Sequence, residues 1–194
     1  MKNVDQNTFL NINLKAIREN YQIVKNKVDK KCIVAATVKA NAYGLGINKV
    51  IPSLKKVGCK YFFVATTSEA IELRKIDKSI IIFILNGLVT SDLNLIRKFK
   101  LVPVINNLNQ LKKFERYQKN QRKSLNIALH FDTGMSRLGF DEKETEYLIY
   151  NKSQLITKSN IVLVMSHLAC ADNDKSSKNK KQLQKFIKIK KHFP

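Results

Sequence analysis

The stretch LNIALHFDTGMSRLGF, residues 125–140, decides how this chain folds. Its first part, LNIAL, is apolar at nearly every position, which is typical of a parallel β-strand buried on both faces. The run leads directly into a glycine-containing segment that holds Asp132 and Arg137. The stretch therefore predicts a buried strand whose carboxyl end presents charged side chains.

Five further apolar runs of strand length lie along the chain. They are CIVAATVK (32–39), YFFVATT (61–67), IIIFILN (80–86), LVPVIN (101–106) and IVLVMSHLA (161–169). A helix-like segment follows each run, and a helix is predicted over residues 14–27 ahead of the first. Helix-start patterns place Asp141 three residues before Glu144, and Asn107 three residues before Gln110. Successive βα units without a hairpin signal predict an α/β fold with a parallel sheet.

Two architectures fit about six βα units: an open doubly wound sheet and an incomplete (β/α)8 TIM-type barrel. No GxGxxG or P-loop pattern follows the first strand, and this absence slightly favours the barrel. The chain ends at Pro194, where a sixth helix would stop, two units short of a closed barrel. We therefore expect an incomplete barrel.

The composition indicates a folded domain. The 194 residues are 44% apolar, which is enough for one domain with its own core. The longest apolar run, SIIIFIL, is far shorter than the ~18 residues of a membrane helix. The opening MKNVDQNTFL lacks the apolar core of a secretory signal. We therefore expect a cytoplasmic protein with no membrane partner.

The charge distribution argues against a nucleic-acid partner, and the cysteine pattern argues against a metal site. The net charge of +21 comes from lysines spread over nearly every segment, while arginine is scarce. We therefore expect no specific nucleic-acid partner and only weak binding to polyanions at low salt. The densest basic stretch, residues 175–193, is predicted to be a helix with solvated lysines. Cys32, Cys59 and Cys170 form no CxxC pair, so we expect no metal site and predict buried thiols at Cys32 and Cys170.

Unusual side chains follow three of the predicted strands. Lys39 ends the first strand and precedes Tyr43, Asp132 and Arg137 follow the fifth, and His167 ends the sixth. Each has an ordinary interpretation alone: a solvated lysine, a local ion pair, a structural histidine. In a βα barrel, however, the carboxyl ends of the strands carry the active site, so the fold would gather these positions on one rim.

This set of side chains suits carbonyl chemistry. A lysine amine that loses its proton near neutral pH forms a Schiff base with a carbonyl, and with pyridoxal phosphate that linkage becomes an electron sink. The guanidinium of Arg137 could bind the phenolic oxygen of the cofactor or a substrate carboxylate, and His167 could pack against the pyridine ring.

Three motifs resemble the alanine racemase family. TVKANAYGLG (37–46) resembles its pyridoxal-phosphate signature, HFDTGMSRLGF (130–140) its second motif, and MSHLACAD (165–172) its T-H-F-A-x-A-D motif. The opening FLNINLKAIRENY resembles the start of the family, in which a strand leads into a helix. The order and spacing agree over essentially the whole chain. The resemblance thus implies that residues 1–194 form the N-terminal barrel domain of the family, truncated before barrel closure.

The resemblance implies a role for each site residue. Lys39 would carry pyridoxal 5'-phosphate as a Schiff base and serve as one of two opposed acid/base groups. Tyr43 would reach the cofactor phosphate, Arg137 would bind the phenolic oxygen and the substrate carboxylate, and His167 would lie beside the pyridine ring. The implied reaction interconverts L-alanine and D-alanine, which feeds peptidoglycan synthesis, and the implied full-length assembly is a homodimer.

The chain departs from the family pattern in three ways. Leu45 replaces a histidine of the signature, and His130 occupies a position where many members carry a carbamylated lysine that braces the arginine. The chain is also about half as long as the family's members. The missing half would hold most of the phosphate cradle, the arginine at the pyridine nitrogen and the tyrosine that is the second base. We therefore expect a fragment of low stability that does not racemise alanine alone.

Two other functions stay open from the sequence. One is a short barrel protein that binds pyridoxal phosphate as a carrier without racemising alanine. The other is a basic binding module in which Lys39 is an ordinary surface lysine.

Overall fold

The structure, a computed structural model, describes residues 9–194. Its strands form one parallel sheet in which each strand pairs with the next along the chain. The strands are β1 (Ala36–Thr37), β2 (Tyr61–Val64), β3 (Ile81–Ile84), β4 (Val102–Ile105), β5 (Asn126–His130) and β6 (Asn160–Met165). Within the described residues, β1 and β6 are the two edges of this sheet. The sequential order of six parallel strands is that of a βα barrel rather than of a doubly wound sheet.

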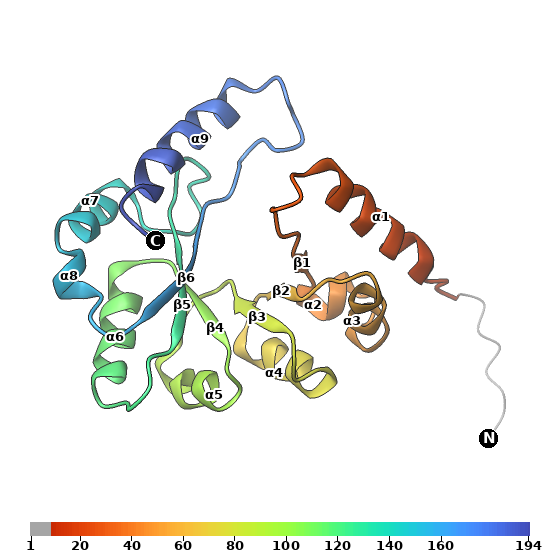
Figure 1. Cartoon of the computed structure of the whole chain (residues 1–194), viewed down its shortest axis with the longest axis horizontal. Helices are drawn as coiled ribbons and strands as arrows, with labels where there is room; N and C mark the ends of the chain where they lie inside the picture. The colour runs from red at the N-terminus through yellow and green to blue at the C-terminus, as the bar shows by residue number, and fades with distance from the viewer. Residues whose placement is uncertain (1–8) are drawn as a thin grey trace.

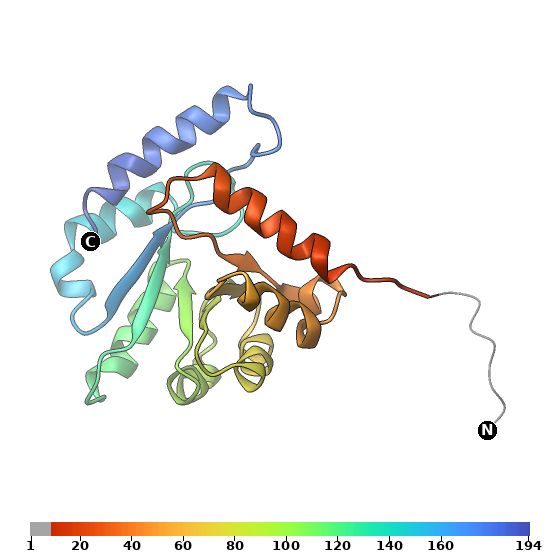
Figure 2. The same ribbon diagram turned by 45° about the vertical axis from the view of Figure 1, so that its right-hand side comes forward.

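Helices lie along the outer side of the curved sheet, and α1 and α9 flank the two ends of the arc (Figures 1 and 2). The helices are α1 (Leu14–Lys27), α2 (Lys39–Tyr43), α3 (Ile47–Lys56), α4 (Thr67–Ile76), the 3-10 turn η1 (Thr90–Asp92), α5 (Leu93–Lys98), α6 (Leu108–Lys119), α7 (Glu142–Tyr150), α8 (Lys152–Leu155) and α9 (Ser177–Lys190). The predicted helix over residues 14–27 is confirmed, as is the helix in the basic stretch.

Apolar side chains are buried on both faces of the sheet. The larger cluster lies between strands and helices and includes Phe62, Phe114 and Ile127, which are fully buried. A smaller cluster on the inner face contains Phe83 and Val104, and Phe83 stacks on the ring of Phe63 at 4.7 Å. This double burial explains why the strand sequences are apolar at nearly every position instead of alternating.

Helix caps and strand limits differ in detail from the sequence predictions. Asp141 and Asn107 cap α7 and α6 as predicted, by accepting hydrogen bonds from the backbone three residues on. The first strand is much shorter than residues 32–39, because only Ala36–Thr37 pairs with β2. Residues 9–13 contain no strand, so the strand that the resemblance implies ahead of α1 is not formed there.

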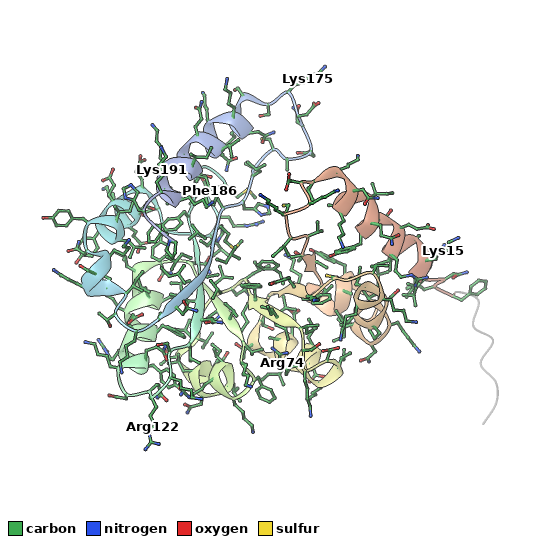
Figure 3. All side chains as sticks on the ribbon, viewed as in Figure 1. Lys15, Arg74, Arg122, Lys175, Phe186 and Lys191 are labelled. Atoms are coloured by element: carbon green, nitrogen blue, oxygen red, sulfur yellow. The ribbon has the colours of Figure 1, made fainter. Side chains whose placement is uncertain are left out.

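The cysteines and lysines complete the description. The prediction for Cys32 was wrong, because this side chain is exposed; Cys170 is half-buried and Cys59 is the buried thiol. Lysines project outward along the surface, as Lys15 and Lys175 do in Figure 3. Among residues 9–194, no helix is both long and apolar enough to cross a bilayer.

Candidate active site at the carboxyl ends of the strands

The structure brings the four predicted site residues together. Lys39, Tyr43, Arg137 and His167 all line one cavity of about 410 Å³ at the carboxyl ends of the strands. This volume is in the range of pockets that bind small organic ligands. A hollow of about 520 Å³ at the opposite ends of β5 and β6 is lined by other residues and contains none of the four. The cavity with Lys39 is therefore the candidate active site.

The backbone turns sharply after Lys39. Residues 40–43 form one turn of left-handed helix, with φ between 51° and 56° at four successive residues that are not glycine. Such a backbone costs an L-residue about 1–2 kcal/mol. The Gly44 N–H donates to the Ala40 carbonyl at 2.9 Å, and the side chain of Asn41 accepts from the backbone of Ile47. The turn places Lys39 and Tyr43 at the same cavity.

A carboxylate from the neighbouring βα unit supports this turn. Glu69, in the first turn of α4, accepts a hydrogen bond from the Ala40 N–H at 2.8 Å and from the Ala65 N–H at 2.7 Å. It also forms a capping box with Thr66, the N-cap of α4. One side chain thus joins the end of β2 to the residue that follows Lys39.

The loop that presents Arg137 is shaped by Asp132. The Asp132 carboxylate accepts hydrogen bonds from the backbone N–H groups of Gly134, Met135 and Ser136 at 2.8–3.1 Å. Burial alone would raise the pKa of Asp132, but these hydrogen bonds outweigh it and the pKa is lowered. The sequence allowed Asp132 and Arg137 to form a local ion pair. Among the described residues, these two side chains do not form a salt bridge with each other.

The base of the same loop is closed by a close backbone approach. The Phe140 N–H donates to the His130 carbonyl at 2.8 Å, and the Asp132 N–H donates to the Phe140 carbonyl at 2.9 Å. A side chain at Gly139, where φ is +112°, would meet the Asp132 nitrogen at 2.7 Å. Glycine is therefore required there, and the loop returns Arg137 to the cavity wall.

His167 is held by contacts between the second and third motifs. The hydroxyl groups of Thr133 and Ser166 are 2.7 Å apart. Gln182 of α9 is buried and donates to the His167 carbonyl at 2.9 Å and to the Thr133 hydroxyl at 3.2 Å. The same side chain accepts from the Ala169 N–H. The loops after β5 and β6 are thus joined through α9.

His130 lies at the end of β5 and lines the cavity, with only 6% of its surface exposed. Its Nδ1 atom is 2.8 Å from the Asn106 side-chain oxygen. The Asn106 amide nitrogen donates to the carbonyls of Leu85 and Val104, so its oxygen must be the group that accepts from His130. The proton is therefore on Nδ1, and Nε2 is a buried acceptor for which residues 9–194 provide no hydrogen-bond partner.

The charge state of His130 follows from these surroundings. Burial lowers its pKa most, the neighbouring His167 and Arg137 lower it further, and Asp132 opposes them; the resulting pKa is about 4. The imidazole is thus neutral at physiological pH. A neutral side chain stands where the family resemblance implies a negative brace for the arginine.

Sequence reasoning missed three supporting residues: Glu69, Asn106 and Gln182. The pattern from Thr66 to Glu69 is a capping box and could have located Glu69 on a helix start. Asn106 contacts His130, which is 24 positions away in the sequence, and Gln182 contacts His167, which is 15 positions away. No local pattern signals such contacts.

The fold and site define the class of protein: a βα-barrel domain with a lysine, an arginine and a histidine around a cavity at its strand ends. Comparison with known proteins is consistent with this class. The chain belongs to the alanine racemase family, because the family model for the alanine racemase N-terminal domain matches residues 12–194.

Individual relatives agree with this assignment. The alanine racemase of Rickettsia prowazekii is 39% identical over 186 residues, which are 95% of this chain and 46% of the relative. The crystal structure of alanine racemase from Bartonella henselae, with covalently bound pyridoxal phosphate, is 33% identical with a TM-score of 0.89 and is matched over 94% of this chain and 53% of that one. The biosynthetic alanine racemase of Pseudomonas aeruginosa is 32% identical with a TM-score of 0.80, over 91% and 48% of the two chains. The chain spans about half the length of these relatives.

Proposed function

We propose that this chain is the cofactor-binding barrel part of an alanine racemase that uses pyridoxal 5'-phosphate. The observation that carries the proposal is the convergence of Lys39, Tyr43, Arg137 and His167, from three separate motifs, on one cavity. The relative from Bartonella henselae, whose structure contains covalently bound pyridoxal phosphate, supports the choice of cofactor. The substrate would be alanine and the product its mirror image, for use in peptidoglycan synthesis.

The residues present fit this cofactor. The cavity has the volume of a small-ligand pocket and contains one primary amine, Lys39, together with the cation Arg137 and the phenol of Tyr43 for anionic groups. It also contains the Nε2 atom of His130, a buried acceptor that no donor among the described residues satisfies. When bound, pyridoxal phosphate supplies an aldehyde that condenses with amines and a ring that accepts the electron pair of a deprotonated carbon.

Each of the four side chains has a separate role in the proposed reaction. The Lys39 amine would hold the cofactor, and when it is released from the cofactor it would take or return the α-proton of alanine on one face. Arg137 would orient the substrate by donating a pair of N–H groups to its carboxylate, and Tyr43 would bind the phosphate. His167, which lines the same cavity, would lie beside the ring. These roles are part of the proposal.

Racemisation also needs an acid/base group on the opposite face of the substrate. We propose that this group and most of the phosphate site come from outside residues 1–194, within a homodimer of longer chains. Residues 1–194 would then be an N-terminal barrel domain that is truncated before the barrel closes. A cytoplasmic location belongs to the same proposal, since the reaction supplies cell-wall synthesis from inside the cell.

Covalent labelling tests the role of Lys39. The chain is incubated with pyridoxal phosphate, treated with borohydride, and digested for mass spectrometry. We expect the reduced cofactor on Lys39, loss of that label in Lys39→Ala, and retention in Lys49→Ala, which removes an exposed lysine of α3. Label spread over surface lysines at equal extent would instead support a basic binding module.

A second assay separates a racemase from a cofactor carrier. D-alanine is measured enzymatically after the chain is mixed with L-alanine and pyridoxal phosphate. The same assay is repeated with a longer chain that includes the product of the coding sequence downstream of Pro194. Formation of D-alanine by the longer chain supports the racemase, whereas specific labelling of Lys39 without D-alanine in either chain supports the carrier.

A further inference from the structure

The left-handed turn after Lys39 needs support that its own residues do not supply. Four successive residues, 40–43, hold positive φ angles without a glycine among them. At about 1–2 kcal/mol each, this conformation persists only where other contacts over-determine it. The hydrogen bonds inside the turn, such as Ala42 N–H to the Val38 carbonyl at 2.9 Å, are also available to competing local turns.

Glu69 supplies a contact from another βα unit. Within residues 9–194, its carboxylate makes the one side-chain hydrogen bond that reaches residues 40–43 from outside the segment 37–47. The acceptor is charged and the donor is the Ala40 N–H, the first amide after Lys39. Hydrogen bonds to charged acceptors are about twice as strong as neutral ones.

The same carboxylate is anchored on its other side. One oxygen of Glu69 accepts from Ala40, and the other accepts from Ala65 at 2.7 Å and from Thr66 at 3.3 Å. Ala65 follows β2 directly, and β2 is the neighbour of β1 in the sheet. Glu69 therefore fixes the turn after β1 relative to the end of β2, in addition to capping α4.

We propose that Glu69 is a positioning residue for Lys39: its carboxylate bridges the Ala40 and Ala65 amides and thereby sets the left-handed turn that delivers the Lys39 amine to the cavity. This inference rests on the proposed function of Lys39. It assigns Glu69 a role beyond the capping of α4.

The chemistry of the bridge requires a carboxylate. Three N–H donors converge on two acceptor oxygens, so Glu69→Gln puts an amide N–H group opposite one of these donors. Either the Ala40 side or the Ala65 side of the bridge is then lost. Glu69→Asp keeps the charge at the start of α4 but is one methylene too short to serve both sides.

The matched control is Thr66→Ala. It removes the other half of the capping box, in which the Thr66 hydroxyl accepts from the Glu69 N–H at 3.3 Å, and leaves the bond from Glu69 to Ala40 in place. Loss of an N-cap hydroxyl costs about 1 kcal/mol of stability. A capping role alone predicts that Glu69→Gln and Thr66→Ala behave alike.

The first measurement is amide hydrogen exchange at Ala40, followed by NMR in the 194-residue chain without cofactor. We expect exchange at Ala40 to be about tenfold or more faster in Glu69→Gln and Glu69→Asp, and unchanged in Thr66→Ala. Amides of α9, far along the chain, serve as the internal reference for folding. Equal protection of Ala40 in all four proteins overturns the inference.

The second measurement is the rate of borohydride-trapped labelling of Lys39 by pyridoxal phosphate. We expect the Glu69 variants to be labelled several-fold more slowly, because small displacements of a reacting group are costly, while Thr66→Ala keeps the wild-type rate. Slow labelling in Thr66→Ala as well would overturn the inference. If the wild-type chain is not labelled at Lys39, the proposed function fails, whereas exchange at Ala40 still decides the role of Glu69.

Discussion

The neutral state of His130 makes the protein sensitive to acid in a defined range of pH. Its Nδ1–H donates to Asn106, and burial holds the pKa of the folded state at about 4, below the usual 6.5. Between these values the unfolded chain binds a proton that the folded chain does not. The contribution of His130 to the free energy of unfolding is therefore fully present above pH 6.5. It is lost as the pH falls from 6.5 towards 4.

The size of this effect follows from the two pKa values. The full difference, from 6.5 to about 4, corresponds to roughly 3 kcal/mol of unfolding free energy. The cavity is open towards the exposed side chains of Tyr43 and Arg137, so solvent screens part of the effect. We expect a loss of about 1–2 kcal/mol between pH 7 and pH 4.5 that comes from His130.

Two experiments measure this directly. Nitrogen-15 NMR of the imidazole rings should show that His130 stays neutral to about pH 4 with its proton on Nδ1. Urea unfolding at several pH values should show a smaller acid-dependent loss in His130→Gln, whose amide can still donate to Asn106. The matched control, His192→Gln, alters an exposed histidine and should follow the wild type. An imidazole of His130 that titrates near pH 6.5, or an unchanged pH dependence in His130→Gln, would refute the reasoning.

Three further predictions follow from the structure. Gly139→Ala should lower the free energy of unfolding by about 3 kcal/mol or more, because the added Cβ would collide with backbone atoms. Gly44→Ala should lower it by only about 1 kcal/mol, because the added Cβ would meet nothing within 4 Å. Urea unfolding of the two variants tests the difference. Asp141→Ala should cost about 1 kcal/mol by the same assay, because it removes the cap of α7, and Asp141→Asn should restore most of it. The 194-residue chain with pyridoxal phosphate should form no D-alanine above the rate of a Lys39→Ala control; wild-type turnover by this chain would contradict the proposed division of the site.

The fold and the positions of the site residues could be predicted because they depend on regular patterns. Doubly buried strands give continuous apolar runs, and a parallel sheet places the residues after each run at one edge. Lys39, Arg137 and His167 could therefore be assigned to one rim from the sequence, and the structure places them at one cavity. The prediction of a long first strand over residues 32–39 was wrong. The left-handed turn and the short pairing with β2 depend on contacts outside that segment.

The supporting polar contacts could not be predicted, because each joins segments that are distant in the sequence. Asn106 is a plausible turn residue by type, yet its amide connects the ends of β3 and β4 to the imidazole at the end of β5. The solvated-helix prediction for residues 175–193 is right for the exposed lysines. It overlooked Gln182, which is 2% exposed, and Lys185, which is half-buried and lies 3.6 Å from the Glu142 carboxylate. A polar residue inside an amphipathic pattern has no local signal for its partner.

These contacts share one property that bears on how the site is maintained. Glu69 joins the ends of β1 and β2, Asn106 joins β3, β4 and β5, and Gln182 joins the loops after β5 and β6. Each bridge runs between neighbouring βα units, so within the described residues these three side chains support the rim through local contacts. The geometry around Lys39, Arg137 and His167 therefore depends on adjacent units rather than on contact between β1 and β6. Under the proposed function, groups from outside residues 1–194 would meet a cavity wall that these bridges already hold in place.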